Sequence, residues 1–236
     1  MRRPGPELPY QLLGGVQSCP GGWLVVGAKL QGISMAPQPA EVLPTFIDLI
    51  DHRPAYSVIA LRLPIGLRSV HQAGGRSCDV AARKLLGRPR SAAIASPPSR
   101  EDLAAFRSGG RPAVSAVVAA QLARIAEAYE VIGSYHQRTV FEVHPELSFF
   151  QLNGNRPLRR PKHTGAGREE RRSLLLEKIP GAERALDHPV AGASPDHLAD
   201  GLALLWTARR IFARAVTRLP ELPEWDEEGF RMELVY

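Results

Sequence analysis

The chain has 236 residues, 44% of them hydrophobic, so it is long enough to bury a sizeable core. Its 30 Lys and Arg residues against 24 Asp and Glu residues give a formal net charge of +6, which favours polyanionic partners without requiring them. This composition excludes fibrous, collagen-like and low-complexity proteins. The two cysteines, Cys19 and Cys78, exclude a disulfide framework and a four-thiolate zinc site. One domain with an insertion and two small lobes both fit this length.

The sequence contains no membrane-spanning pattern. Its longest apolar-rich run, Ala113 to Ala123, includes Ser115 and Gln121 and is far shorter than the ~20 residues that a spanning helix needs. A basic start at residues 1–6 is not followed by an apolar segment, so we expect no signal peptide. We therefore expect no membrane partner and a cytoplasmic location. The oligomeric state stays open.

The first part of the chain predicts a βαβ unit. Residues 12–26 read as two short strands around a turn at Pro20, Gly21 and Gly22, and residues 28–44 hold a third strand interrupted by prolines. A short helix over 45–53 then leads to an almost continuously apolar strand over 57–63. Because ligands gather at the carboxyl ends of parallel strands, Gln17 and Arg62 lie where a site is expected.

Residues 68–137 read as a mostly helical insertion. Ser77 to Leu86 predicts a short helix that ends at Gly87, and Val114 to Ile132 predicts a longer one with an apolar stripe at helical spacing. Such a stripe is more typical of a core than of a ligand site. We therefore expect a single domain over residues 1–236 that contains this helical insertion.

The last third of the chain predicts a strand, a basic segment and a closing helix. The strand over 139–144 has a period of two, which places Glu142 and His144 on one face. The segment 156–172 holds seven Lys and Arg residues against two Glu residues, so most of the net charge lies there. Ser194 is a typical N-cap for the last helix, and residues 230–236 predict a final strand.

Polar residues from separate elements converge in this arrangement. The ends of three predicted strands carry Gln17, Arg62 and Glu142, and the last helix opens with Asp196 and Asp200, which share a helical face. Carboxylates brought together from strands and a helix are what a two-metal phosphodiesterase uses to hold Mg²⁺. Gln17 and Arg62 are not carboxylates, however, and this departure shapes the functional prediction.

Six segments in order resemble a known family. They are GVQSCPGGW, LRLPIGL, RSCDVAARKLLGRPR, FEVHPELSFFQLNG, PKHTGAGREER and DHLADGLALLWTARR. Together they resemble the domain of unknown function 429 family of predicted nucleases with an RNase H-like fold. The resemblance implies an α/β protein whose antiparallel hairpin strands are continued by parallel strands in one mixed sheet, with a helical insertion and a C-terminal helix. It also implies Mg²⁺ or Mn²⁺ as cofactor where the family's acidic site is intact.

The acidic site of the family is incomplete in this chain. The family's GVDG and IDIPIGL motifs place aspartates at the positions of Gln17 and Arg62, whereas its glutamate matches Glu142. In the final DDxxDA motif, Asp196 and Asp200 match, and His197 replaces the aspartate between them. In the basic segment, the family's pattern matches three residues that would hold a phosphate group: Lys162, Arg168 and Arg171.

We interpret the sequence as a degenerate, catalytically impaired site that retains binding to nucleic acid or another phosphate-bearing ligand, with no cofactor expected. A guanidinium does not deprotonate at accessible pH, so Arg62 is predicted to replace a metal and to pair with Glu142, Asp200 or both. Two alternatives stay open. The first is an active metal-dependent phosphodiesterase that uses Glu142, Asp196 and Asp200, with Glu142 and Asp200 as the metal ligands. The second is a non-catalytic protein-interaction scaffold.

Several of these residues also have a plainer explanation, whereas Asp200 within an apolar helix is harder to explain structurally. Asp196 is favourable at a helix N-terminus without any catalytic role, and Glu142 could form an ordinary salt bridge. His144 and His197 are more often structural than metal ligands. The basic segment could be a solvated helix face, and it lacks the interleaved aromatic residues that stack bases of a single strand.

Overall fold

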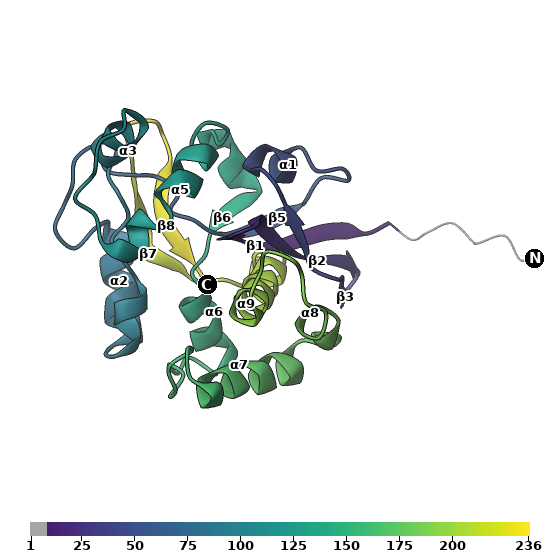
Figure 1. Ribbon diagram of the computed structural model, residues 1–236. Coiled ribbons are helices and arrows are strands. Elements are labelled where there is room, and N and C mark those ends of the chain that lie inside the picture. Colours follow the sequence, from purple (N-terminus) through teal and green to yellow (C-terminus); the bar gives the residue numbers. More distant parts are fainter. Residues whose placement is uncertain (1–8) are drawn as a thin grey trace, which may run out of the picture.

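The computed structural model describes residues 9–236, and its centre is one mixed β-sheet (Figure 1). Strand β1 lies between an antiparallel β2 and a parallel β5, and β6 continues the parallel part. The strand order is β3 (Ser34–Pro37), β2 (Gly22–Gln31), β1 (Gln11–Cys19), β5 (Val58–Arg62) and β6 (Val140–Glu142), while β4 (Glu41–Leu43) also pairs with β2. The predicted α/β class with antiparallel strands continued by parallel strands is confirmed.

Helices surround this sheet, and a small second sheet closes the chain. The helical elements are α1 (Phe46–Ile50), α2 (Ser77–Leu86), η1 (Arg90–Ala93), α3 (Arg100–Arg107), α4 (Ala116–Ala119), α5 (Leu122–Ala128), η2 (Ser134–Arg138), α6 (Pro145–Leu152), α7 (Gly165–Lys178), α8 (Glu183–Leu186) and α9 (Pro195–Phe212). The second sheet pairs β7 (Arg218–Trp225) with β8 (Arg231–Val235). Elements α2 to η2 all lie between β5 and β6, in the stretch expected to be a helical insertion.

The β1–β2 hairpin starts the fold and sets its register. Cys19 pairs with Gly22 across the tight turn, and Gln11 pairs with Leu30 at the far end. Gly22 has a positive φ of 142° and lies so close to the backbone of Leu43 that a side chain there would overlap it. The predicted turn glycine is therefore required both by its backbone conformation and by the neighbouring strand.

Helix α9 packs on one face of the sheet. Leu13 of β1 and Ala60 of β5 contact this helix through Leu202 and its buried neighbours. A Cβ atom on Gly15 would overlap backbone atoms of α9, including the carbonyl oxygen of Gly201. The glycine therefore allows helix and strand to approach closely, and this brings the start of α9 next to the ends of β1 and β5.

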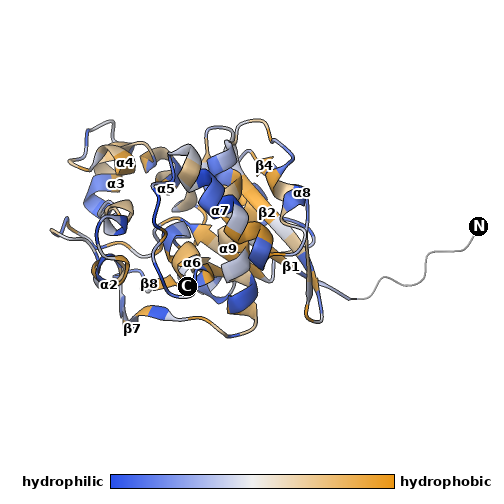
Figure 2. Cartoon of the chain, turned by 90° about the horizontal axis from the view of Figure 1, so that it is seen from below, coloured by the Kyte–Doolittle hydropathy of each residue, from blue (hydrophilic) through white to orange (hydrophobic). Residues whose placement is uncertain are grey.

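The opposite face of the sheet is covered by α1 and α5. Leu61 of β5 and Trp23 of β2 pack there with Phe46 and Ile125. The indole N–H of Trp23 donates to Oε1 of Glu127 over 3.1 Å, so its polar atom is satisfied in the core. In Figure 2, β2 and α9 are coloured largely as hydrophobic, whereas α7 carries many hydrophilic residues on the outside. The sheet thus has two separate apolar faces, each with its own helices.

Several local expectations need correction. The segment 114–132 does not form one helix, because the chain turns at Ala120 and Gln121 between α4 and α5; Val118 and Leu122, on either side of this turn, are both buried in the core. The stretch 28–44 holds the end of β2 and two further strands, β3 and β4, instead of one strand. Helix α6 and strand β7 were not anticipated. Among the strands of residues 9–236, β7 pairs only with β8, through a shifted register. It contains Pro220 and Pro223, which an edge strand tolerates because it has one side without a pairing strand.

None of the helices in residues 9–236 combines the length and apolar character needed to cross a membrane. The basic start of the chain at residues 1–6, on which the expectation about a signal peptide rests, lies outside the described residues.

Candidate functional site

The two residues at the positions where the family resemblance implies aspartates are hydrogen-bonded neighbours. Gln17 and Arg62 are paired in register at the ends of β1 and β5. Arg62 Nη1 donates to Gln17 Oε1 over 3.0 Å, and Gln17 Nε2 donates to the carbonyl oxygen of His197 over 2.6 Å. Gln17 is fully buried, where an unpaired amide would be costly. These two contacts give both its oxygen and its nitrogen a hydrogen-bond partner. Gln17 and Arg62 therefore form a hydrogen-bonded pair that links the ends of β1 and β5 to α9.

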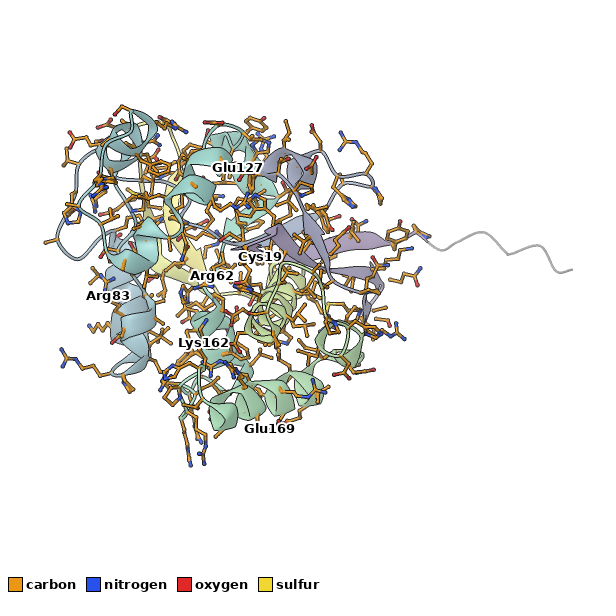
Figure 3. The ribbon with its side chains drawn as sticks, viewed as in Figure 1. Cys19, Arg62, Arg83, Glu127, Lys162 and Glu169 are labelled. Carbon is orange, nitrogen blue, oxygen red and sulfur yellow. The ribbon has the colours of Figure 1, made fainter. Side chains whose placement is uncertain are left out.

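Asp200 of α9 lies beside this pair. Its carboxylate is 2% exposed and its Oδ2 lies 3.6 Å from Arg62 Nη1. The same oxygen accepts a hydrogen bond from Lys162 Nζ over 3.1 Å. Figure 3 labels Arg62 and Lys162 in the middle of the molecule, where the end of the sheet meets the loop before α7. The carboxylate of Asp200 therefore lies next to two cationic side chains, Arg62 and Lys162. Together the three side chains carry a formal charge of +1.

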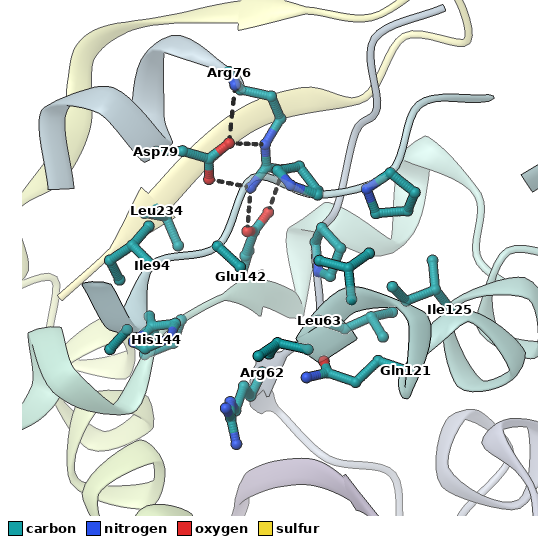
Figure 4. Close-up of a pocket in the computed structure, with 18 residues that line it drawn as sticks. Arg62, Leu63, Arg76, Asp79, Ile94, Gln121, Ile125, Glu142, His144 and Leu234 are labelled. Atoms are coloured by element: carbon teal, nitrogen blue, oxygen red, sulfur yellow. Dashed lines mark hydrogen bonds and ion pairs between the residues drawn. The ribbon is translucent and has the colours of Figure 1, made fainter. Parts of the chain in front are cut away.

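Glu142 does not join this group. It is paired with Leu61 in the β5–β6 register, and Leu61 packs on the face covered by α5, whereas Arg62 faces α9. Because side chains alternate along a strand, neighbours at the ends of β5 and β6 point to opposite faces. Figure 4 shows Glu142 and Arg62 pointing away from each other. Of the two carboxylates that Arg62 was expected to approach, only Asp200 lies near it.

Arg76 holds Glu142 instead. Both residues are buried, and Arg76 donates from Nη2 to Glu142 Oε1 over 2.5 Å and from Nη1 to Oε2 over 2.8 Å. The backbone N–H of Ile65 also donates to Oε2 over 2.7 Å. Burial raises the pKa of Glu142 to about 7, against the opposing effect of Arg76. Every oxygen of this carboxylate thus has a partner inside the protein.

Asp79 completes this second cluster, which the sequence analysis missed. Its Oδ2 accepts hydrogen bonds from both the backbone N–H and Nε of Arg76, and its Oδ1 accepts from Nη2. Asp79 is the third residue of α2, so its carboxylate reaches back over the helix N-terminus. An arginine followed three residues later by an aspartate at a helix start was the signal available in the sequence.

Glu146 and Arg171 form a third pair. Arg171 Nη2 donates to Glu146 Oε1 over 2.6 Å, and both side chains are less than a tenth exposed. The guanidinium also lies 5.2 Å from the ring centroid of Phe149. Arg171, one of the three residues expected to hold a phosphate, is therefore committed to a carboxylate in the interior.

Arg168 and Asp196 lie further out. Arg168 Nε donates to Asp196 Oδ1 over 2.9 Å, and both side chains are partly exposed. They line a hollow of about 190 Å³ between α7 and α9, which Lys162 and Asp200 also reach. Asp196 is thus paired at the surface and does not meet Glu142.

Two histidines flank the group around Asp200. His144 is the N-cap of α6, and its Nδ1 accepts a hydrogen bond from the backbone N–H of Glu146 over 3.2 Å. Burial, with the nearby cations Arg62 and Lys162, holds the pKa of His144 well below its usual value. Burial also lowers the pKa of His197, whose Nδ1 lies near Ser194. Both rings cap helices and are neutral near pH 7.

The largest hollow near these residues is a cationic groove of about 460 Å³. Three of its lining residues carry cationic side chains, namely Arg62, Arg90 and Lys162. Its two carboxylates, Glu146 and Asp200, are the ones already paired with arginine or lysine. The groove therefore presents net positive charge to a ligand. We call this hollow the cationic groove below.

The residues present do not fit the metal centre that the family resemblance implies. Within residues 9–236, no group of three or more His, Cys, Asp or Glu side chains is arranged to hold a metal ion. Glu142 and Asp200, the two expected ligands, belong to different clusters and each is paired with cations. A divalent ion about 4 Å from the Arg62 guanidinium would experience a repulsion of roughly 8 kcal/mol at an effective dielectric constant near 20.

Comparison with known proteins identifies one family. The model of a family described as protein of unknown function (DUF429) matches residues 15–224. No curated protein and no solved structure matches the chain significantly. The matched segment runs from the first strand of the hairpin, through both buried clusters, to the second sheet. The chain belongs to the DUF429 family of proteins of unknown function.

Proposed function

We propose that this protein binds a phosphate-bearing ligand, with nucleic acid as the leading class, in the cationic groove and without cleaving it through a divalent metal. The observation that carries the proposal is the contact chain from Asp200 through Arg62 to Gln17. A guanidinium on this chain supplies the positive charge that a metal would otherwise bring. It supports binding to phosphate oxygens, because planar guanidinium groups match their geometry.

The strand order supports an RNase H-like fold as part of this proposal. The antiparallel strands β3, β2 and β1 continue into the parallel strands β5 and β6, which agrees with the arrangement that the family resemblance implies. In that arrangement the ends of β1 and β5 would carry catalytic carboxylates. Here they carry Gln17 and Arg62. The proposal is therefore of an inherited groove whose chemistry has changed from metal binding to direct anion binding.

The charges lining the groove support an anionic ligand. Glu146 is paired with Arg171, and Asp200 is paired with Arg62 and Lys162. The positive groups that remain available to a ligand are Arg90 and the N–H groups of Arg62 and Lys162 that do not contact Asp200. The side chains of Arg62 and Lys162 are 26% and 40% exposed, which leaves N–H groups for an incoming phosphate. Such contacts release counterions from a nucleic acid, and the affinity must then fall as salt rises.

A binding measurement tests the proposal directly. We expect a labelled single-stranded oligonucleotide to bind in the presence of a metal chelator, with log Kd depending on log salt concentration. Lys162→Gln should weaken binding and reduce the salt slope by about 0.7 for one lost contact to a single strand. Arg111→Gln removes the same charge from an exposed position elsewhere and should change neither quantity.

Two outcomes would overturn the proposal. Binding that is independent of salt, or equally strong in the Lys162→Gln variant, would remove the groove as the anion site. Magnesium-dependent cleavage by the wild-type protein that is lost in Asp200→Asn would restore the alternative of an active phosphodiesterase.

A further inference from the structure

A second hollow lies at the opposite end of β5 from the cationic groove. Its volume is about 500 Å³, and we call it the Arg–Phe hollow. Its lining residues are Val58, Arg138, Phe141, Ile211, Phe212, Arg214, Val216 and Arg218. Val58 begins β5 and Arg62 ends it, so about 13 Å of strand separates the two sites. The Arg–Phe hollow therefore shares no lining residue with the cationic groove.

The charge of the Arg–Phe hollow has one sign. Every polar residue that lines it is an arginine, and in the part of the chain that the structure describes the lining contains no carboxylate. Arg138 and Arg214 are exposed and form no ion pair within residues 9–236, whereas Arg218 pairs with Glu233. Two guanidinium groups are thus available to an anionic ligand.

The floor of the hollow is apolar and partly aromatic. Val58 and Ile211 are buried beneath it, Phe141 is half-buried, and Phe212 is 42% exposed. The guanidinium of Arg218 lies 5.8 Å from the ring centroid of Phe141. An exposed phenylalanine beside free arginines offers a stacking face and phosphate donors at the same place.

The last residue of α9 and the chain after it build this pattern by alternation. Phe212, Arg214, Val216 and Arg218 are two residues apart, and all four line the hollow. Arg214 has a φ of 56°, a left-handed conformation that glycine usually supplies at the end of a helix, and its N–H donates to the carbonyl oxygen of Ile211. Position 214 therefore carries an arginine side chain although glycine would adopt this backbone conformation with less strain.

We infer that the Arg–Phe hollow is a second binding site, for a segment of single-stranded nucleic acid of which a base stacks on Phe212 while Arg138 and Arg214 contact its phosphates. Aromatic faces interleaved with cations are how proteins hold single strands with little dependence on sequence. The basic segment 156–172 lacks such aromatic residues, so a stacking face distinguishes the Arg–Phe hollow from that segment. The inference does not depend on ligand binding in the cationic groove.

An anisotropy titration with a labelled oligothymidylate of about ten nucleotides, in the presence of a chelator, tests this inference. Because stacking on an aromatic side chain is worth a severalfold change in affinity per base, Phe212→Ala should weaken binding about fivefold or more. An abasic oligonucleotide with the same phosphates should bind more weakly than oligothymidylate to the wild type, and Phe212→Ala should not change its affinity. Phe212 is partly exposed, so this variant is expected to fold.

The arginines have their own readout and control. Arg138→Gln with Arg214→Gln should reduce the salt slope by about 1.4, as expected for two lost contacts to single-stranded phosphates. Lys84→Gln with Arg111→Gln removes the same charge from exposed positions outside the hollow and should leave the slope unchanged.

Three results would overturn the inference. The first is equal affinity of wild type and Phe212→Ala for oligothymidylate. The second is equal affinity of the wild type for abasic and normal strands. The third is displacement of the strand by polyglutamate of equal charge, which would assign the hollow to acidic proteins. If Lys162→Gln weakens binding and the Arg–Phe variants do not, the proposal for the cationic groove stands and this inference fails.

Discussion

The exchange of Gln17 and Arg62 for aspartate should convert the group around Asp200 into a metal site. In the wild type, Asp200, Arg62 and Lys162 together carry a formal charge of +1. The double variant Gln17→Asp with Arg62→Asp removes one positive charge and adds two negative charges, so the same place carries −2. The repulsion of roughly 8 kcal/mol that Arg62 imposes on a divalent ion about 4 Å away is also removed.

Thermal unfolding with and without metal measures the effect. A ligand that binds only the folded state stabilises it by RT ln(1 + [L]/Kd), which is about 1.4 kcal/mol for ~10 mM Mn²⁺ and a Kd near 1 mM. For a chain of this size, that corresponds to a rise in Tm of about 3–6 °C. Without metal, the double variant should be less stable than the wild type, because it loses the hydrogen bond between Arg62 and Gln17 and gathers three carboxylates.

A neutral double variant provides the matched control. Gln17→Asn with Arg62→Asn shortens the same side chains without adding negative charge, so Mn²⁺ should not raise its Tm. If the wild type shows the same metal-dependent rise as the aspartate variant, Arg62 does not exclude metal. If a folded aspartate variant shows no larger rise than the asparagine variant, the idea that these positions once completed an acidic site is refuted.

Three further predictions concern stability and pH. Glu146→Gln should lower the free energy of unfolding by about 3–5 kcal/mol, since it leaves the buried guanidinium of Arg171 without its carboxylate, and adding Arg171→Met should recover most of the loss in urea denaturation. Because the pKa of His144 lies below its ordinary value, its contribution to stability is complete above about pH 6.5 and is lost as the pH falls; His144→Asn should flatten this dependence, and an unchanged profile would contradict it. Gly15→Ala should cost about 1–3 kcal/mol or more in thermal unfolding because its Cβ meets the backbone of α9, whereas Gly165→Ala, which meets no atom, should be neutral or stabilising.

Local patterns in the sequence were sufficient for much of the fold. The start and turn of the hairpin over 12–26 and the helix over 77–86 were predicted correctly, because turn glycines and apolar periodicity act within a few residues. The second strand of the hairpin runs further than predicted, to Gln31. Segment 114–132 shows where this fails. Its apolar stripe is compatible with one helix, yet the chain turns at Gln121, and apolar periodicity alone does not locate such a turn.

The candidate site was predictable only in part. The juxtaposition of Gln17, Arg62 and Asp200 follows from strand ends that meet at the start of α9, and the sequence order of these elements was enough to expect it. The separation of Glu142 was not predictable in the same way. Its face depends on the β5–β6 register, and a shift of one residue would turn its side chain to the other side of the sheet.

The sequence by itself determined which charges the protein carries and which elements hold them. The tertiary structure alone decided which charges meet. Arg76 and Glu142 are 66 residues apart in the chain, and Lys162 and Asp200 are 38 apart, so no local pattern specifies either pair. Packing decides which residues become partners, because a charge buried between helices and a sheet is costly unless an opposite charge lies beside it. That opposite charge can come only from residues that the fold places nearby.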